Sequence, residues 1–221
     1  MPLCQTIGLA IKRLDCLKRK FIRDSKFHSD YTDFINDMIS KGFARRAERL
    51  HDENDQWFIP HHGVYHPTKK KVRVVFDCSS KFKGKSLNQE LLQGPDLTNQ
   101  LVGVLTRFRQ HPIATMGDIS SMFYQVMIPE SQRRYVKFLW WRDGNFNNDF
   151  EEYEMCAHLF GGTSSPSCAN YSLRKAATDG EEKYGREAAE TLRRNFYVDD
   201  MLKSTEKVFP TIQLVDDVSN M

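Results

Sequence analysis

The sequence predicts an α+β fold with mostly antiparallel strand pairing. Apolar residues recur at helical spacing in some segments and alternate as in strands in others. Successive strand-like segments are separated by short turn-rich stretches, which is typical of hairpins, and no internal repeat occurs. The 221 residues are 40% hydrophobic and 28% charged. This composition is that of a globular chain long enough for a buried core, and it excludes disorder.

The first half of the chain alternates helical and extended patterns. A helix is predicted over residues 31–49, where apolar side chains recur at helical spacing until Gly42 interrupts them near the end. Strands are predicted over 57–65 and 72–76, and a turn-rich loop separates them from a helix over 96–110.

The second half contains the shorter hairpins. An apolar segment over 113–128 predicts a buried strand that runs into a turn at Gly117-Asp118. The elements predicted after it are a hairpin of 135–141 and 153–159 around an acidic loop over 142–152, helices over 165–178 and 181–194 separated by Asp179-Gly180, strands over 195–198 and 201–203, and a last helix from 208.

Charge is distributed unevenly, although the net charge is only +3. Residues 1–50 hold eleven Lys and Arg against six Asp and Glu, and residues 66–85 hold seven bases against Asp77 alone. Residues 143–154 carry five acids and no base. A basic strand region of this kind suits a protein that binds a polyanion, and a solvated charged surface is the alternative.

Cysteine usage and hydropathy exclude several classes of protein. The five cysteines are odd in number and form no CxxC pair, which argues against a disulfide framework and a structural zinc site. No apolar run approaches the length of a membrane span, and the N-terminus lacks the pattern of a signal peptide. We therefore expect an intracellular protein without a membrane partner, with Cys78, Cys156 and Cys168 as small buried hydrophobes.

Histidines and tryptophans give weaker candidates. His61, His62 and His66 have no acidic or cysteine partner at metal-ligand spacing, so we expect them at the surface or facing a template. Of the adjacent Trp140 and Trp141, one is expected in the core and the other exposed or stacking.

Three carboxylates stand in apolar surroundings. Asp118 follows the segment PIATMG, and Asp199 and Asp200 lie inside FYVDDML, at the tip of a predicted hairpin. Adjacent carboxylates repel, and burying either one unpaired is costly. A solvent-exposed Asp-Asp turn is one explanation. The other is that the strand of Asp118 lies beside the hairpin and that the three acids hold Mg²⁺, which prefers hard oxygen ligands.

Four motifs in order resemble those of reverse transcriptases. They are RVVFD at 73–77, DISSMFYQ at 118–125, LFGGTSSP at 159–166 and YVDD at 197–200. The wording WFIPHHGVYHPTKKKVRVVFDCSS, SLNQELLQGPDL, LTRFRQHPIATMGDISSMFYQV and HLFGGTSSPSCANY is similar to the Bel/Pao class of LTR retrotransposon polyproteins. The resemblance covers roughly residues 28–221.

The resemblance implies a fold and a domain organisation. It implies reverse-transcriptase-like fingers and palm, the palm being a ferredoxin-like antiparallel sheet backed by helices. The expected organisation is an N-terminal helical lead-in over 1–55 and a reverse transcriptase region over 56–221. Within that region we expect fingers at about 56–93 and 129–158, and palm at about 94–128 and 159–221.

The resemblance also implies site residues and chemistry. Asp118, Asp199 and Asp200 would be the catalytic residues and would hold two Mg²⁺ ions, with Mn²⁺ as the alternative. The primer 3′-hydroxyl would attack the α-phosphorus of a dNTP, and pyrophosphate would leave. The residues implied to bind the nucleotide are Arg73, Lys71 (or Lys70), Phe123 as a steric gate against the 2′-hydroxyl, Phe160, Gly161 and Tyr197. Asp77 is instead expected to partner a nearby Arg, and Phe123 has a core position as its alternative.

The partners implied are an RNA or DNA template with its primer, dNTPs, and the protease, RNase H and integrase of a polyprotein. The compartment implied is the cytoplasm or a virus-like particle, with the nucleus as an alternative. Because the sequence ends 21 residues after Asp200 and shows no thumb, RNase H or integrase motif, we expect a fragment comprising the fingers and most of the palm. The rival hypotheses are a catalytically silent nucleic-acid-binding remnant of a decayed element and a palm nucleotidyltransferase that makes RNA.

Overall fold

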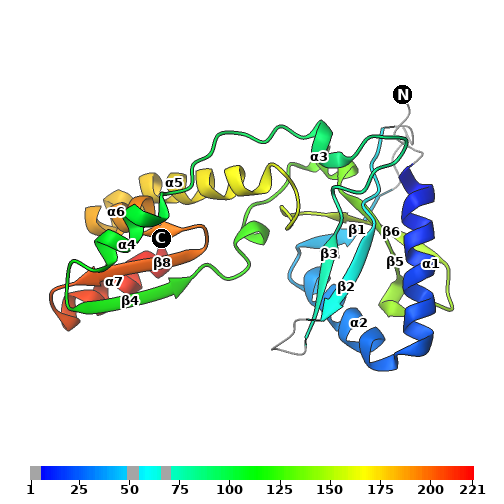
Figure 1. Cartoon of the computed structure of the whole chain (residues 1–221), viewed down its shortest axis with the longest axis horizontal. Coiled ribbons are helices and arrows are strands. Elements are labelled where there is room, and N and C mark those ends of the chain that lie inside the picture. The colour runs from blue at the N-terminus through cyan, green and yellow to red at the C-terminus, as the bar shows by residue number, and fades with distance from the viewer. Residues whose placement is uncertain (1–5, 49–54, 66–70) are drawn as a thin grey trace. The chain divides into compact units, whose positions relative to one another are not determined.

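The structure, a computed structural model, describes residues 6–48, 55–65 and 71–221. His66 and Lys70 therefore lie outside the described residues. The chain forms two compact units (Figure 1), which we describe separately. Unit 1 comprises Met1–Leu92 and Met127–Ser165, and unit 2 comprises Gln93–Val126 and Pro166–Met221. Both units combine helices with antiparallel sheets, so the α+β prediction is confirmed.

Unit 1 contains two small sheets covered by helices. Strands β1, β6 and β5 form one antiparallel sheet in that order, and β2 and β3 form a hairpin. The elements are α1 (Ile7–Arg23), α2 (Ser25–Ser40), β1 (Ala44–Arg46), β2 (His61–Tyr65), β3 (Val72–Phe76), α3 (Leu87–Glu90), the short 3₁₀ helix η3 (Glu130–Tyr135), β5 (Lys137–Trp141), the 3₁₀ turn η4 (Arg142–Gly144) and β6 (Phe150–Met155).

Aromatic side chains form the core of unit 1. The ring of Tyr31 stacks on Trp140 with centroids 5.3 Å apart, and the ring of Phe21 meets Tyr31 edge-on at 5.3 Å. Trp140 and Trp141 are both buried, and Trp141 packs edge-on against Phe21 in the core. Of the two expectations for the second tryptophan, exposed or stacking, the exposed position was wrong. Each large ring removes much apolar area from water, and this burial holds α1 and α2 against β5.

The second helix begins and ends earlier than its apolar spacing predicted. Its start is fixed by the carboxylate of Asp24, which accepts from the backbone N–H of Phe27 at 2.9 Å. Its end is fixed by Gly42, whose φ is +74°. The N–H of Phe43 donates to Met38 O and that of Gly42 to Ile39 O, which is a Schellman motif. The chain after Gly42 is therefore free to pair as β1, where a helix to residue 49 had been predicted.

The second strand of the acidic hairpin begins at residue 150 and not at the predicted 153, so residues 150–152 of the loop predicted over 142–152 belong to a strand. β6 begins at Phe150, opposite Trp141 of β5. Its acids pair with bases of the neighbouring strands: Glu151 with Arg46 at 3.0 Å, Glu152 with Lys137 at 2.9 Å and Glu154 with Arg45 at 2.7 Å. The charge of this segment is thus largely matched across the sheet.

Unit 2 is an antiparallel sheet backed by helices, as the palm description required. The strand order is β4-β8-β7. Its elements are α4 (Leu101–Phe108), β4 (Ile113–Asp118), the 3₁₀ helix η2 (Met122–Gln125), α5 (Ser165–Tyr184), α6 (Arg186–Arg194), β7 (Phe196–Tyr197), β8 (Asp200–Thr205) and α7 (Val208–Asn220).

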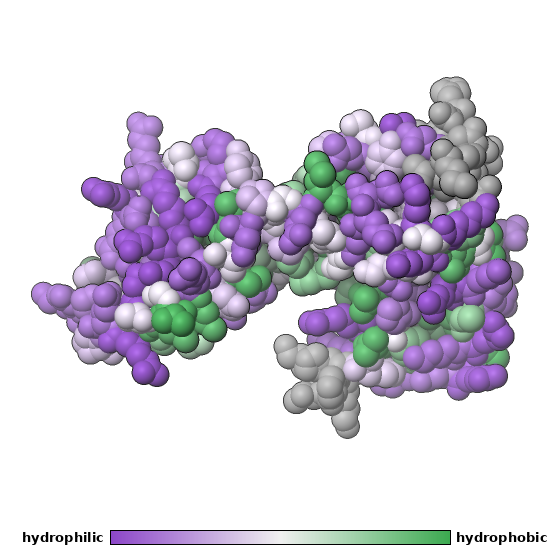
Figure 2. Space-filling view, turned by 45° about the horizontal axis from the view of Figure 1, so that its top comes forward, coloured by the Kyte–Doolittle hydropathy of each residue, from purple (hydrophilic) through white to green (hydrophobic). Residues whose placement is uncertain are grey.

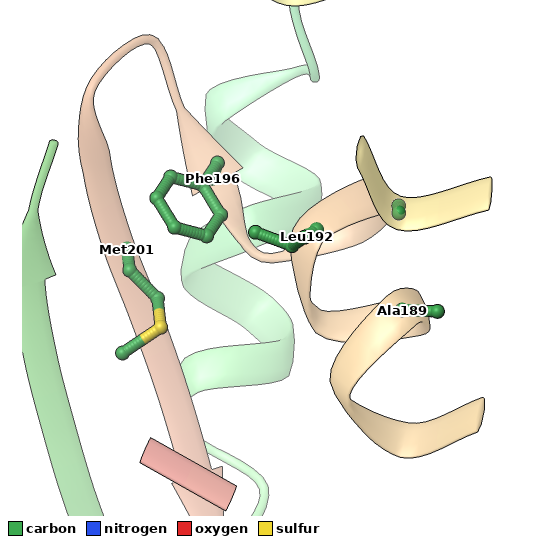
Figure 3. Close-up of a cluster of buried hydrophobic side chains, with 5 residues drawn as sticks. Ala189, Leu192, Phe196 and Met201 are labelled. Carbon is green, nitrogen blue, oxygen red and sulfur yellow. The ribbon is translucent and has the colours of Figure 1, made fainter. Parts of the chain in front are cut away.

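A small buried apolar cluster joins the helices of unit 2 to its sheet. The cluster comprises Ala177, Ala189, Leu192, Phe196 and Met201. In Figure 3 the ring of Phe196 lies between Met201 of β8 and Leu192 of α6. Full burial of a Leu, Phe or Met side chain stabilises the folded state by roughly 1.5–3 kcal/mol. The contact therefore anchors the short hairpin of β7 and β8 on the helical layer.

Several predicted boundaries in unit 2 were wrong for local reasons. The helix over 96–110 is only Leu101–Phe108, because Asp96 accepts from the N–H of Thr98 in a turn. α5 continues through the predicted break at Gly180 and ends at Gly185, whose φ is +88°. A Cβ at Gly180 would lie 2.5 Å from the Met221 side chain, so this glycine permits close packing within a helix.

Polar residues cover most of the surface. Figure 2 shows hydrophilic residues over most of the visible face of each unit, with small separate apolar patches. Among the described residues, none of the helices is both long and apolar enough to cross a bilayer.

His61 is a core residue, which corrects the expectation of a surface position; His62, its neighbour, is exposed. The Nδ1 atom of His61 lies 2.5 Å from the hydroxyl oxygen of Tyr31. The Nε2 atom of the same ring donates to Leu139 O at 2.8 Å. Burial lowers the pKa of His61 to about 4, because the protonated ring would lose its hydration inside the core.

We predict that unit 1 loses stability as pH falls from 6.5 to 4. The unfolded imidazole takes up a proton near pH 6.5 while the folded one resists protonation until about pH 4, so stability present above pH 6.5 is lost over this window. The loss attributable to His61 is about 3 kcal/mol. Urea unfolding at a series of pH values measures it. His61→Gln should flatten this part of the pH dependence and His62→Gln should retain it; equal slopes in all three proteins would contradict the assignment.

Candidate active site

The register of β4 against β8 places two acids side by side. Asp118, the last residue of β4, is the antiparallel partner of Asp200, the first residue of β8. The next N–H along, that of Ile119, donates to Asp199 O at 3.0 Å. A shift of the pairing by one residue would send one of these side chains to the opposite face. The sheet register therefore determines that Asp118 meets the hairpin.

The hairpin of β7 and β8 turns through two residues. Tyr197 pairs with Asp200, which leaves Val198 and Asp199 in the turn. Val198 has φ +58°, a left-handed conformation that is strained for a β-branched residue. Buried Asn195 stabilises the hairpin base, because its side-chain amide donates to Leu202 O at 3.0 Å while its own carbonyl accepts from Leu202 N–H at 2.8 Å.

The three carboxylates converge. One oxygen each of Asp118, Asp199 and Asp200 lies within 4.8 Å of the others; Asp118 and Asp200 are exposed and Asp199 is half-buried. Three anionic oxygens at an accessible sheet edge leave room for water and phosphate as further ligands. This donor set fits a hard divalent cation such as Mg²⁺ or Mn²⁺.

Asp118, alone among the three acids, lines a mainly apolar cavity of about 590 Å³ within unit 2. Asp118 and Gly117 lie at its edge, and apolar side chains of the sheet, α5 and α7 line it, among them Met122, Leu173, Phe196, Met201 and Val218.

Two further predicted site residues lie in unit 2 with the triad. Phe123 is in η2, on the turn that follows β4, and is partly exposed. The residue before this turn helix, Ser121, has φ +54°. Tyr197 is half-buried and faces Asp200 across the hairpin.

The other four predicted nucleotide-binding residues belong to unit 1. Arg73 is exposed on β3, opposite Val64, and Lys71 is exposed immediately before that strand. Phe160 is 51% exposed, and Gly161 has φ +98°. A Cβ on Gly161 would lie 3.1 Å from Phe76 O, so the glycine-rich loop approaches the end of β3 closely.

Asn88 is a positioning residue that the sequence analysis missed. Its amide donates to Gly161 O at 2.9 Å and to Ser79 Oγ at 3.1 Å, and its Oδ1 accepts from Thr163 N–H at 2.9 Å. It thereby ties the glycine-rich loop to the turn after β3. The available signal was the S-x-x-Q pattern of Ser86 and Gln89, which predicts a short helix that presents Asn88.

Asp77 differs from its predicted role. Its carboxylate accepts from the N–H of Ser79 at 3.2 Å, and its own N–H donates to Pro60 O at 2.8 Å. It forms a local turn after β3. The expectation of an Arg partner is replaced by this backbone role.

The fold resembles that of reverse transcriptases. The prototype foamy virus protease-reverse transcriptase aligns with a TM-score of 0.63 at 16% identity over 89% of this chain and 22% of that one. The foamy viral protease-reverse transcriptase in complex with an RNA/DNA hybrid aligns with a TM-score of 0.63 at 18% identity, over 89% of this chain and 22% of that one. The foamy viral protease-reverse transcriptase in complex with dsDNA aligns with a TM-score of 0.60 at 18% identity, over 87% of this chain and 34% of that one.

These likenesses define a reverse-transcriptase-like fold, which confirms the fold predicted from the four motifs. The chain spans about a fifth to a third of the length of these structures. Its sequence matches none of the protein-family models and none of the curated proteins compared with it.

We predict that relieving the turn strain stabilises unit 2. Val198→Gly should raise its free energy of unfolding by about 1 kcal/mol, because glycine adopts a positive φ without the steric cost that a β-branched residue carries. Urea unfolding of unit 2 tests this. Val198→Ala, which keeps a Cβ in the left-handed region, should gain less, and a glycine variant no more stable than the wild type would show that the turn is unstrained.

Proposed function

We propose that this chain comprises the fingers and most of the palm of an RNA-directed DNA polymerase from a Bel/Pao-class LTR retrotransposon polyprotein. Its reaction would transfer dNMP from a dNTP to a primer 3′-hydroxyl. The observation that carries the proposal is the convergence of Asp118, Asp199 and Asp200 at one sheet edge. The reverse-transcriptase-like fold and the four ordered motifs support it.

The triad would hold two Mg²⁺ ions, or Mn²⁺. Bound there, divalent cations supply charge neutralisation for the triphosphate and acidify the primer hydroxyl. The protein's own contribution is position: the β4–β8 register holds Asp118 against Asp200, and the turn holds Asp199 beside both.

Unit 1 would contribute to nucleotide binding through its basic and glycine-rich segments. The guanidinium of Arg73 suits a phosphate because it donates in a planar fork, and Lys71 adds a second cation at the same strand. Both side chains are exposed and so accessible to a ligand. Gly161 leaves its backbone accessible to a close neighbour, and Phe160 presents an exposed ring for stacking.

The first test is metal binding, because it needs no catalysis. Mn²⁺ titration of the whole chain, followed by electron paramagnetic resonance, should show binding that Asp199→Asn and Asp118→Asn each weaken at least tenfold. The matched control is Asp216→Asn/Asp217→Asn, which removes another adjacent acid pair, on α7. Equal affinity in the triad variants and this control would overturn the proposed site.

The second test is single-nucleotide primer extension on an RNA template with dNTPs and Mg²⁺. Asp199→Asn/Asp200→Asn should lower incorporation at least about a hundredfold, because the charge that the triad contributes in the transition state is lost. The Asp216→Asn/Asp217→Asn control should retain it. Incorporation that survives in the triad variant would refute the mechanism, and duplex binding without metal binding or extension would favour the silent remnant.

The third test addresses the sugar. If the ring of Phe123 lies against the ribose of the incoming nucleotide, Phe123→Ala should raise the ratio of rNTP to dNTP incorporation about tenfold or more, because space for the 2′-hydroxyl opens. The alternative is a core role for Phe123. In that case the variant lowers both activities together and leaves the ratio unchanged.

A further inference from the structure

The first helix carries a strongly basic outer surface. α1 contains six bases and one acid, Asp15. Its apolar side, formed by Ala10, Leu14, Leu17 and Phe21, is buried. Four exposed residues at spacings of four, three and four lie on the opposite side of the helix: Lys12, Cys16, Arg19 and Arg23. At about 100° per residue they fall within about 60° of one another around the axis, and we call them the α1 stripe.

The bases of the α1 stripe have no carboxylate partner among the described residues. Arg19 donates to Asp15 O and to Cys16 Sγ, both within its own helix. The first acids after α1 have other partners: Asp24, the N-cap of α2, accepts from Phe27 N–H, and Asp30 pairs with Lys26 at 3.0 Å. This contrasts with β6, where three acids have basic partners.

The other bases of α1 extend the charge around the stripe. Arg13 is exposed beside Lys12, and the ammonium of Lys20 lies 3.6 Å from the ring centroid of Phe27. Lys18 lies near the ring of Phe146. Bases therefore flank the stripe on the exposed side of the helix, which also carries Asp15 and the exposed Ile22.

We infer that the α1 stripe binds the phosphate backbone of a nucleic-acid duplex. Lys12 and Arg23 are separated by about 16 Å along the helix, a length over which one strand of a duplex presents roughly five phosphates. The stripe offers no apolar anchor of the kind that the centre of a protein interface requires. This inference goes beyond the proposed function, because it concerns nucleic-acid contact by unit 1 and needs no catalysis.

A lipid surface fits the helix less well. Amphipathic helices bind membranes by inserting their apolar side below the headgroups. In α1 that side is occupied within unit 1, where Phe21 contacts Tyr31 and Trp140 and is 2% exposed. Insertion would require α1 to leave the core.

The test is duplex binding by the whole chain in EDTA, measured by fluorescence anisotropy over a range of salt concentrations. The probe is DNA of about two helical turns. Lys12→Gln/Arg19→Gln/Arg23→Gln should weaken binding about tenfold or more near 0.1 M salt. It should also lower the slope of log K against log salt by about two to three, since three phosphate contacts are lost.

The matched control removes three bases elsewhere. Lys41→Gln/Lys175→Gln/Lys183→Gln gives the same change in net charge at exposed positions, since Lys41 is the C-cap of α2 and the other two lie on α5. It should retain nearly all of the affinity and slope. The urea midpoint of each triple variant should match that of the wild type, which shows that both are folded. If both variants then lose duplex affinity equally, the loss is an effect of net charge and the inference is overturned.

Cys16 gives a local readout in the unmodified chain, because this exposed thiol lies within the stripe. Saturating duplex should slow its reaction with N-ethylmaleimide several-fold, as quantified by peptide mass spectrometry, while phosphatidylserine vesicles and polyglutamate should not. An unchanged rate with duplex, or equal protection by vesicles or polyglutamate, would overturn the inference. Because Asp199→Asn/Asp200→Asn should leave this protection intact, failure of the polymerase proposal and failure of this one are distinguishable.

Discussion

The pairing of β4 with β8 is the constraint on which the candidate site depends. It brings Asp118 opposite Asp200, although these acids are 82 residues apart in the sequence. Like charges about 5 Å apart in water repel by about 1 kcal/mol for each pair. The pairing is held against this repulsion by the ladder of β4 and β8 from Ile113 to Asp118. The hairpin that carries Asp199 and Asp200 is anchored by Phe196 and Met201, which are buried against the helices, and by the hydrogen bonds of Asn195 to Leu202. The core of unit 2 thus stabilises a charge arrangement that the isolated strands would oppose.

Residues whose role depends on local chemistry were predictable from sequence. The hairpin around Asp199 and Asp200 follows from apolar flanks on either side of a polar pair, and the strand over 72–76 follows from alternation. What could not be predicted depended on contacts distant in sequence. Gly180 was expected to end a helix, yet α5 continues through it, and the close approach of Met221 gives a packing reason for a glycine at this position. Likewise, His61 became a core residue through Tyr31 and Leu139.

The distribution of charged residues along the sequence predicted poorly which segments are exposed and which are loops. The acids of residues 143–154 suggested a solvated loop, yet Glu151, Glu152 and Glu154 pair with bases on adjacent strands. The bases of α1 were part of a diffuse N-terminal excess in the sequence, and the helix arranges them opposite a buried apolar side. Whether a charged segment is available to a ligand therefore depends on its partners across the sheet or helix, which composition does not record.

The turn at Val198 explains why two consecutive residues can serve one site. In a regular strand adjacent side chains point to opposite faces, so Asp199 and Asp200 could not both reach Asp118 from the interior of a strand. The hairpin places Asp199 in the turn and Asp200 at the start of β8, and both carboxylates then lie with that of Asp118. The left-handed φ of Val198 is part of that reversal. Local backbone strain is therefore the structural cost of bringing two adjacent acids together with Asp118.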